Sequence, residues 1–193
     1  MKSLSKISAL TVLAIAFTSL AQAQTTPTAS DRPIVLSVGA EGGFSAGSFK
    51  HANKWNIGGS LQADFPVADK LYLTANAGYL NFFGKNNYYP NSNDAPDINL
   101  LPVKAGLKYF PVQRFYVKAD AGSAFVLNKR EAGYGKTAAF IYSPQIGVQL
   151  PLGGKNFIDA AAYYEASTKF TTGVDNSKVN FFGARLAYAF EVK

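Results

Sequence analysis

The sequence predicts an all-β protein, a closed eight-stranded antiparallel up-and-down transmembrane β-barrel. Apolar residues recur at every second position in eight segments, the connections between these segments alternate between short and long, and aromatic residues make up 14% of the chain. A period of two is typical of strands with two unlike faces. Short turns alternating with long loops are typical of barrels that cross an outer membrane.

The chain begins with the three parts of a secretory signal peptide. Lys2 and Lys6 precede an uncharged apolar run over residues 9–20, and the small residues Ala21 and Ala23 then mark a cleavage site. The run spans 12 residues, too few for a membrane-crossing helix, which needs about 20. We therefore expect residues 1–23 to be removed, residues 24–33 to form a periplasmic lead, and residues 34–193 to form the barrel domain.

The composition excludes several functional classes. The chain has no cysteine, so it has no disulfide framework, no thiolate chemistry and no cysteine for a lipid anchor. Its net charge of +7, or +5 without the first two lysines, is scattered along the sequence, which does not indicate nucleic acid as a partner. No carboxylate pair, phosphate loop or metal-spaced cluster occurs, so we expect no cofactor, no bound metal and no catalytic residues.

The eight segments follow one another from Ile34 onward. The second, from Trp55 to Phe65, is the clearest, because its odd-numbered residues are apolar or glycine and its even-numbered ones polar or glycine. In one segment, over residues 156–167, Ala161 and Tyr163 blur the polar face. The remaining segments are 71–81, 98–110, 115–127, 140–150 and 178–190.

The connections alternate strictly in length. The expected short turns, 66–70, 111–114 and 151–155, have 5, 4 and 5 residues, whereas the loops 45–54, 82–97, 128–139 and 168–177 have 10, 16, 12 and 10. Each short turn starts with a proline, Pro66, Pro111 or Pro151, and proline is expected where pairing stops because it has no N–H for the ladder. This asymmetry predicts short turns and both chain ends in the periplasm and long loops outside the cell.

The two faces of the segments predict what lies inside the barrel and what lies outside. The apolar face is expected to contact lipid, and the other face mixes glycines with five acidic and four basic residues, which are Glu41, Asp64, Lys104, Lys108, Lys118, Asp120, Asp159, Glu165 and Arg185. Charges that nearly cancel suit a closed lumen, because unpaired buried charge is costly. Eight strands enclose only enough room for side chains. We therefore predict a plugged lumen in which Glu41, Lys104, Asp120 and Arg185 form an ion-pair network.

Aromatic residues are expected in two girdles, one at each boundary between lipid and water. The girdle near the short turns includes Phe65 and Tyr109, and the one near the long loops is expected to include Phe82, Phe170 and Phe181.

The final segment resembles a known assembly motif. Its ending, Leu186-Ala187-Tyr188-Ala189-Phe190, is similar to the C-terminal assembly signal of outer-membrane barrels, with Leu186, Tyr188 and Phe190 at alternating positions. Glu191, Val192 and Lys193 follow the aromatic residue, on which the usual signal ends. With the signal peptide and the loop asymmetry, the mature chain resembles the OmpA and OmpX-like outer membrane β-barrel domain family. This resemblance implies insertion by the barrel assembly machinery into outer-membrane lipid.

These features predict an integral protein of the cell outer membrane, a monomer with a structural or surface-interaction role. The loop 82–97, with Phe82-Phe83 and Tyr88-Tyr89, is the candidate site for an unidentified surface ligand. The alternatives are a small porin-like diffusion channel, a lipid A-modifying barrel enzyme and a soluble periplasmic lipid-binding barrel.

The enzyme alternative depends on a histidine placed beside a serine or a carboxylate at the outer rim. The single histidine, His51, has Ser48 and Ser45 nearby in the sequence but no acidic residue to orient it. We therefore predict that the protein is not an enzyme.

Overall fold

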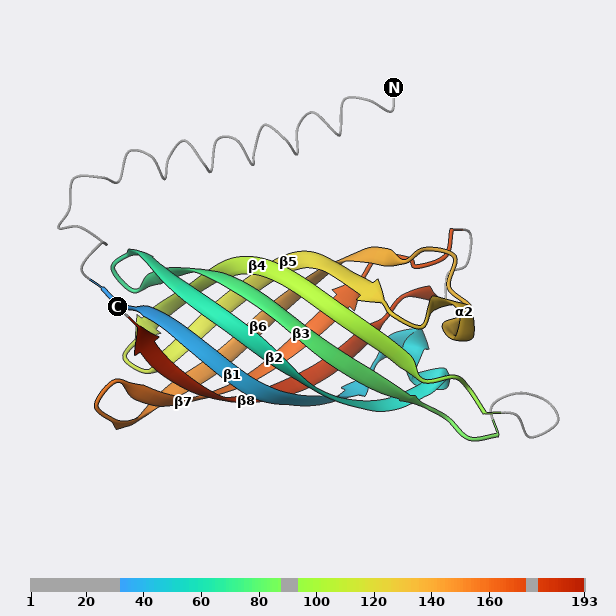
Figure 1. Ribbon diagram of the computed structural model, residues 1–193, viewed down its shortest axis with the longest axis horizontal. Helices are drawn as coiled ribbons and strands as arrows, with labels where there is room; N and C mark the ends of the chain where they lie inside the picture. The colour runs from blue at the N-terminus through green and yellow to red at the C-terminus, as the bar shows by residue number, and fades with distance from the viewer. Residues whose placement is uncertain (1–31, 88–93, 173–176, 193) are drawn as a thin grey trace, which may run out of the picture. The chain divides into compact units, whose positions relative to one another are not determined.

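A computed structural model describes residues 32–87, 94–172 and 177–192, and eight antiparallel strands in it close into a barrel (Figure 1). Each strand pairs with its neighbours in the chain, and the last pairs with the first. This confirms the predicted fold class. The strands are β1 (Ile34–Ser45), β2 (Asn53–Ala68), β3 (Leu71–Gly84), β4 (Ile98–Val112), β5 (Phe115–Val126), β6 (Ala138–Gly153), β7 (Asn156–Ser167) and β8 (Asn180–Val192).

In the described parts of the long connections lie two short helices. The 3-10 helix η2 (Gly47–His51) joins β1 to β2, and α2 (Lys129–Ala132) lies between β5 and β6. Among the described residues, no helix has both the length and the hydropathy of a membrane-spanning helix. The expected signal peptide with Ala21 and Ala23, and the lead up to residue 31, lie outside the described residues.

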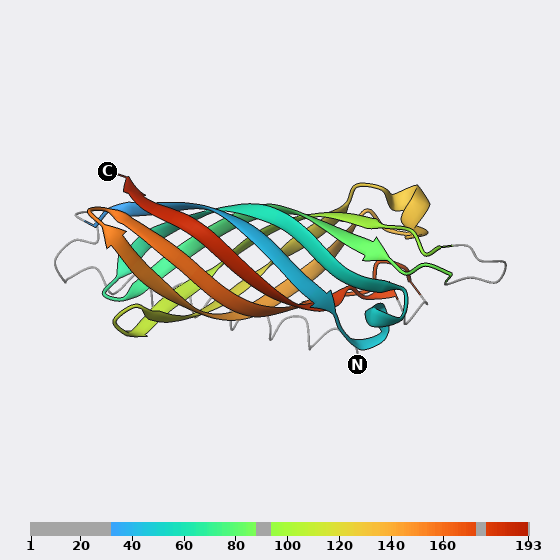
Figure 2. The ribbon, with the colours of Figure 1, turned by 90° about the horizontal axis from the view of Figure 1, so that it is seen from below.

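The seam between β1 and β8 completes the barrel, and Figure 2 shows the two strands side by side. Ile34 pairs with Val192 at one end of the seam and Ser45 with Phe181 at the other. Because the seam is paired throughout, the barrel has no free strand edge. Ile34 and Val192 lie at the same end as the short turns (Figure 1).

The three short connections are tighter than the sequence predicted. They consist of residues 69–70, 113–114 and 154–155, and Pro66, Pro111 and Pro151 lie inside β2, β4 and β6. A register shift occurs at each of these prolines. The prediction that pairing stops at the prolines was therefore wrong, because a bulge accommodates the missing N–H and pairing resumes beyond it.

Two further prolines stand in the middle of strands. Pro102 of β4 falls in a gap of the β3–β4 ladder between Leu100 and Val103, and Pro144 of β6 falls in a gap of the β6–β7 ladder. The register on the two sides of each gap is the same, so the proline removes bonds without adding a residue.

The charged face of the strands points inward. The nine charged residues named for this face are between 0% and 8% exposed, whereas outward residues such as Leu61 and Leu186 are 63% and 60% exposed. At the height of these charged residues the barrel is therefore polar inside and apolar outside.

Glycines on the inner face make room for two lumen tyrosines. Gly147 pairs across strands with Tyr116, and Gly183 with Tyr163. A Cβ atom at either glycine would overlap the ring of its partner tyrosine. The glycines thus let both rings lie close against the barrel wall.

Candidate functional site: the lumen network and the apolar plug

The largest group of paired charges in the lumen surrounds Lys108 of β4. Its Nζ donates to Asp64 Oδ2 of β2 at 2.9 Å and to Asp159 Oδ2 of β7 at 3.0 Å. The same Nζ lies 4.1 Å from the ring centroid of Tyr116. Two carboxylates and an aromatic face therefore replace the water that this buried cation has lost.

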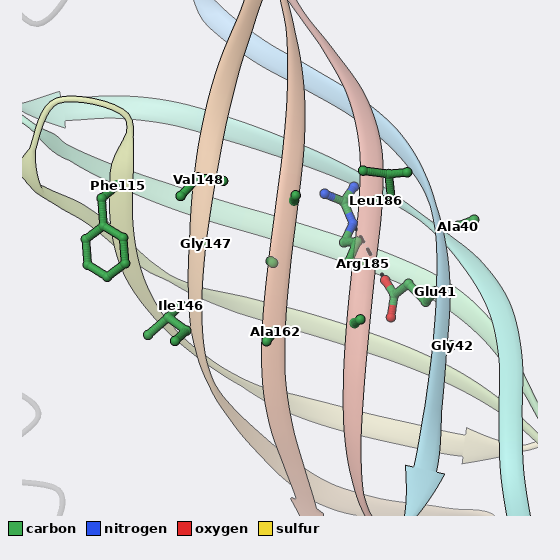
Figure 3. A pocket seen from close by; sticks show the side chains of 13 residues that line it. Ala40, Glu41, Gly42, Phe115, Ile146, Gly147, Val148, Ala162, Arg185 and Leu186 are labelled. Carbon is green, nitrogen blue, oxygen red and sulfur yellow. Dashed lines mark ion pairs between the residues drawn. The ribbon is translucent and has the colours of Figure 1, made fainter.

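Arg185 of β8 forms an ion pair with Glu41 of β1, drawn as a dashed line in Figure 3. The two residues are paired in register across the barrel seam, and Arg185 Nε lies 3.7 Å from Glu41 Oε1. The guanidinium also donates to the hydroxyls of Ser60 and Ser37, both at 2.9 Å. Its Nη1 lies 3.9 Å from Asp159 Oδ1, so the seam pair is continuous with the Lys108 group.

The structure brings together two of the four residues predicted for the network, Glu41 and Arg185, and gives the other two different partners. Lys104 Nζ lies 2.6 Å from Glu165 Oε2. Asp120 pairs with Lys118 at 2.8 Å and accepts a hydrogen bond from Thr74 at 3.0 Å. Asp120 is thus held by its own strand and by β3 rather than by Lys104.

Side chains from all eight strands enter this network, and many of the bonds cross the lumen between strands that are not neighbours. Lys104 reaches from β4 to β7, and Lys118 Nζ reaches from β5 to Gln62 Oε1 of β2 at 2.7 Å. Such cross-lumen bonds place paired side chains in the interior of the barrel at this height. We call this set the lumen network. Its members are Ser37, Glu41, Ser60, Gln62, Asp64, Thr74, Lys104, Lys108, Tyr116, Lys118, Asp120, Gln145, Gln149, Asp159, Tyr163, Glu165 and Arg185.

Two tyrosines that were not predicted as members belong to the lumen network. The Tyr116 hydroxyl donates to Asp159 Oδ1 at 2.7 Å and accepts from Gln145 at 3.0 Å. The Tyr163 hydroxyl donates to Glu41 Oε2 at 2.5 Å. Both tyrosines occupy polar-face positions in the alternating pattern, so the apparent blur at Tyr163 was the signal of an inward phenol.

An apolar cluster lies inside the barrel at the long-loop end, and we call it the apolar plug. Phe82 of β3 contacts Phe181 of β8 with ring centroids 5.0 Å apart and Phe49 of η2 at 5.3 Å. Phe82, Phe170 and Phe181 are completely buried, so their expected place in the outer aromatic girdle was wrong. The plug also contains Leu80, Ile98, Leu100, Ala124, Val126, Ala139, Ile141, Tyr163 and Val179.

Among the described residues, three of the four long connections contribute an aromatic ring to the plug. Phe49 comes from the first, Tyr134 from the third and Phe170 from the fourth, and Tyr134 stacks on Phe170 with centroids 5.0 Å apart. Burial raises the pKa of the Tyr134 phenol above its ordinary value of 10.0. Described residues of these connections therefore pack apolar side chains onto the cluster at the long-loop end.

The outer girdle at this end retains other aromatic residues. Trp55 stacks on Phe83 with centroids 4.2 Å apart, and the exposed residues Phe140 and Phe182 continue the belt on β6 and β8. In the candidate ligand loop, Phe82 lies in the plug and Phe83 stacks on Trp55. Tyr88 and Tyr89 lie outside the described residues.

The outer face over β6, β7, β8 and β1 is hollowed into a shallow groove, the region drawn in Figure 3. Ala40, Ala162 and Ala184 line it, and Ile146 and Leu186 border it. Of the expected assembly signal, Leu186 and Tyr188 face outward and Phe190 is half-buried.

His51 stands at the exposed end of η2, and Ser48 in the same helix is also exposed. The Ser45 hydroxyl is buried and has no hydrogen-bond partner among the described residues. Anywhere in the described residues, no three His, Cys, Asp or Glu side chains form a group that could hold a metal ion.

Comparisons with known proteins agree on the architecture. No protein-family model and no curated protein matches the sequence. Among solved structures, the outer membrane protein OprG from Pseudomonas aeruginosa has a TM-score of 0.54 at 12% identity, over 83% of this chain and 96% of OprG. The outer membrane protein AlkL, determined in lipid bilayers, has a TM-score of 0.54 at 14% identity, over 84% of this chain and 90% of AlkL.

A third structure, the Yersinia pestis outer membrane protein Ail in a phospholipid nanodisc, has a TM-score of 0.52 at 14% identity, over 84% of this chain and 100% of Ail. At these identities the likeness concerns the fold. The chain therefore has the fold of the small eight-stranded outer-membrane β-barrels, the fold that its resemblance to the OmpA and OmpX-like family implies.

Proposed function

We propose that this chain is an integral outer-membrane protein with a closed lumen, and that it acts through its rigid barrel and its outer surface rather than as a channel or an enzyme. The observation that carries the proposal is the arrangement of the two faces. Nine charged residues are buried in the lumen while a belt of large apolar side chains is exposed around the outside. Such a belt is stable in hydrocarbon and costly in water.

The lumen network and the apolar plug both argue against a diffusion channel. The network fills the interior with cross-lumen bonds, and the plug covers it at the long-loop end. A water-filled pore needs a wider barrel.

The soluble lipid carrier is the other alternative from the sequence. Such a carrier keeps its apolar residues inside the barrel and its polar residues outside, which is the reverse of the distribution found along these strands. We further propose that the protein is a monomer inserted by the barrel assembly machinery, with the long loops outside the cell and both termini in the periplasm. The outward direction of Leu186 and Tyr188, two residues of the expected assembly signal, supports insertion by the assembly machinery.

Membrane fractionation tests the location. We expect the protein to stay in the pellet after carbonate extraction and to migrate faster on a gel when unheated than when boiled. Release into the carbonate supernatant would overturn the proposal in favour of a soluble barrel.

Planar bilayer recording tests whether the lumen is closed. We expect the purified protein to insert without stepwise conductance. Reproducible conductance steps that scale with the amount of inserted protein would favour the diffusion channel instead.

A further inference from the structure

Two residues of β8 lie beyond the expected assembly signal. The strand does not stop at Phe190 but continues through Glu191 and Val192. Both residues are half-buried and paired with β1, Glu191 with Val35 and Val192 with Ile34. Because the usual signal ends on its aromatic residue, these two residues lie outside it. We call Glu191 and Val192 the seam strap.

The backbone of Glu191 also ties β8 to the turn between β6 and β7. Its N–H donates to the carbonyl oxygen of Lys155 at 3.0 Å. Lys155 is the last residue of that turn, and the residue after it, Asn156, pairs with Phe190. The bond therefore extends the β7–β8 ladder by one step beyond the aromatic residue.

The same backbone bond occurs at the other two short turns. The N–H of Phe110 donates to the carbonyl oxygen of Lys70 at 2.9 Å, and the N–H of Gln149 to that of Arg114 at 2.7 Å. In all three cases the donor directly follows the residue that pairs with the first residue of the strand after the turn. The three bonds are thus equivalent by register, and Glu191 holds in β8 the place that Phe110 holds in β4 and Gln149 in β6.

A β8 that stopped at Phe190 would lack this bond. The positions equivalent to Phe190 by register lie inside β4 and β6, and both of these strands continue past them. Without the seam strap, the Lys155 carbonyl would lose its donor from β8. Ile34 would lose Val192, and within the described strands it is paired with no residue of β2.

The seam differs from other strand junctions at the short-turn end. Within the described chain no turn joins β8 to β1 there, whereas short turns join β2 to β3, β4 to β5 and β6 to β7 (Figure 1). Strand ends without a covalent connection fray most readily. β1 and β8 are also the first and last strands of the barrel in sequence, so their pairing is highly non-local and is expected to form late in folding.

We propose that the seam strap is a backbone clasp that keeps the barrel closed at the short-turn end, where β8 and β1 have no turn to join them. One of its bonds ties β8 to the turn at Lys155, and its pairing with Ile34 and Val35 ties β8 to β1. Because these contacts form late, their loss speeds unfolding more than it slows folding. The proposal concerns the barrel itself and does not depend on what the outer surface binds.

A variant that stops after Phe190 tests the proposal in detergent micelles. We expect it to fold as fast as the wild type but to unfold about tenfold faster in urea, because the backbone bonds of the strap are missing. The loss of the fast-migrating band on unheated gels measures both rates. Hydrogen exchange, followed by mass spectrometry, should become about tenfold faster over residues 34–38 and stay unchanged at the long-loop end of β1.

Matched variants separate the backbone of the strap from its side chains. E191Q/V192A keeps every backbone bond and should unfold at the wild-type rate. E191P keeps the length of the chain but removes the N–H that Lys155 accepts, and should speed exchange at the seam. Q149P removes the equivalent N–H at Arg114 and should speed exchange between β5 and β6 while leaving the seam unchanged.

Three results would overturn the proposal. The first is unchanged unfolding and exchange in the shortened variant. The second is equal acceleration in E191Q/V192A, which would assign the effect to the side chains, or equal acceleration of seam exchange in Q149P, which would show a general weakening. The third is a shortened variant that never gives the fast-migrating band, which would show that these residues are needed to reach the fold rather than to hold it closed.

Discussion

Lys108 illustrates what a single residue contributes to this barrel. Its ammonium group is fully buried and contacts Asp64, Asp159 and the face of Tyr116. A buried ion pair often adds little stability compared with well-packed apolar residues, but removing one partner leaves an uncompensated charge. The lumen network therefore makes the fold intolerant of single charge deletions more than it makes the fold stable.

The Lys108→Met variant is expected to lower the free energy of unfolding by about 3–5 kcal/mol, because two buried carboxylates lose their shared cation. Guanidinium unfolding in detergent micelles, followed by tryptophan fluorescence, measures this loss. Lys50→Met removes an exposed lysine and should change the stability by less than about 0.5 kcal/mol. Adding Asp64→Asn and Asp159→Asn to Lys108→Met should recover part of the loss, and failure to recover any would argue that lost packing rather than charge is responsible.

At the scale of the strand, the period of two was sufficient to predict all eight elements and the inward direction of the nine charged residues. The same period also predicts that the plug residues of β3 point inward, because Leu80 and Phe82 are even-numbered like the inward residues Thr74 and Asn76. Phe82 was expected in the girdle because it is close to a loop in the sequence, but its even-numbered position in the strand predicts the inward direction that the structure shows.

Two features of the strands could not be predicted from the alternation. The partners of Lys104 and Asp120 depend on the register between strands. The alternating pattern does not fix this register, because a shift of one strand by two residues keeps the same face inward. The bulges at Pro66, Pro111 and Pro151 moved the turns two or three residues along the chain, because a bulge tolerates a residue without an N–H.

Pro144 of β6 offers a test of how a strand behaves when one donor is missing. Restoring the N–H with Pro144→Val is expected to slow hydrogen exchange of the β7 amides near Tyr164 about tenfold, because the interrupted ladder is completed. The free energy of unfolding should change little, because two effects oppose each other. The new hydrogen bond contributes about 0.5–1.5 kcal/mol, whereas loss of the proline raises the conformational entropy of the unfolded chain and costs about 0.4–1 kcal/mol. Pro111→Val, at a bulge beside a turn, is the control and should leave β7 exchange unchanged; unchanged exchange in both variants would show that the gap does not weaken the ladder.

At the scale of the whole molecule, charge and apolar surface are sorted into zones along the barrel. Paired charges lie in the lumen, and apolar side chains form both the outer belt and the plug. Tyr163 links two of these zones, because its ring packs on Phe181 in the plug and its hydroxyl bonds to Glu41 in the lumen network. Side chains thus occupy the interior in two layers, an apolar layer at the long-loop end and a polar layer below it.

Truncating a side chain of the plug tests whether each of the two layers can close the lumen by itself. Phe82→Ala is expected to lower the free energy of unfolding by about 3–5 kcal/mol, because a fully buried ring leaves a cavity, and to speed hydrogen exchange at the long-loop end. Planar bilayers should nevertheless show no conductance, because the cross-lumen bonds of Lys104 and Lys118 do not depend on Phe82. Phe125→Ala, which truncates an exposed girdle ring, controls for loss of an aromatic residue and should leave loop-end exchange unchanged. Conductance steps in Phe82→Ala alone would show that the plug is the only seal and that the charged layer below it admits ions.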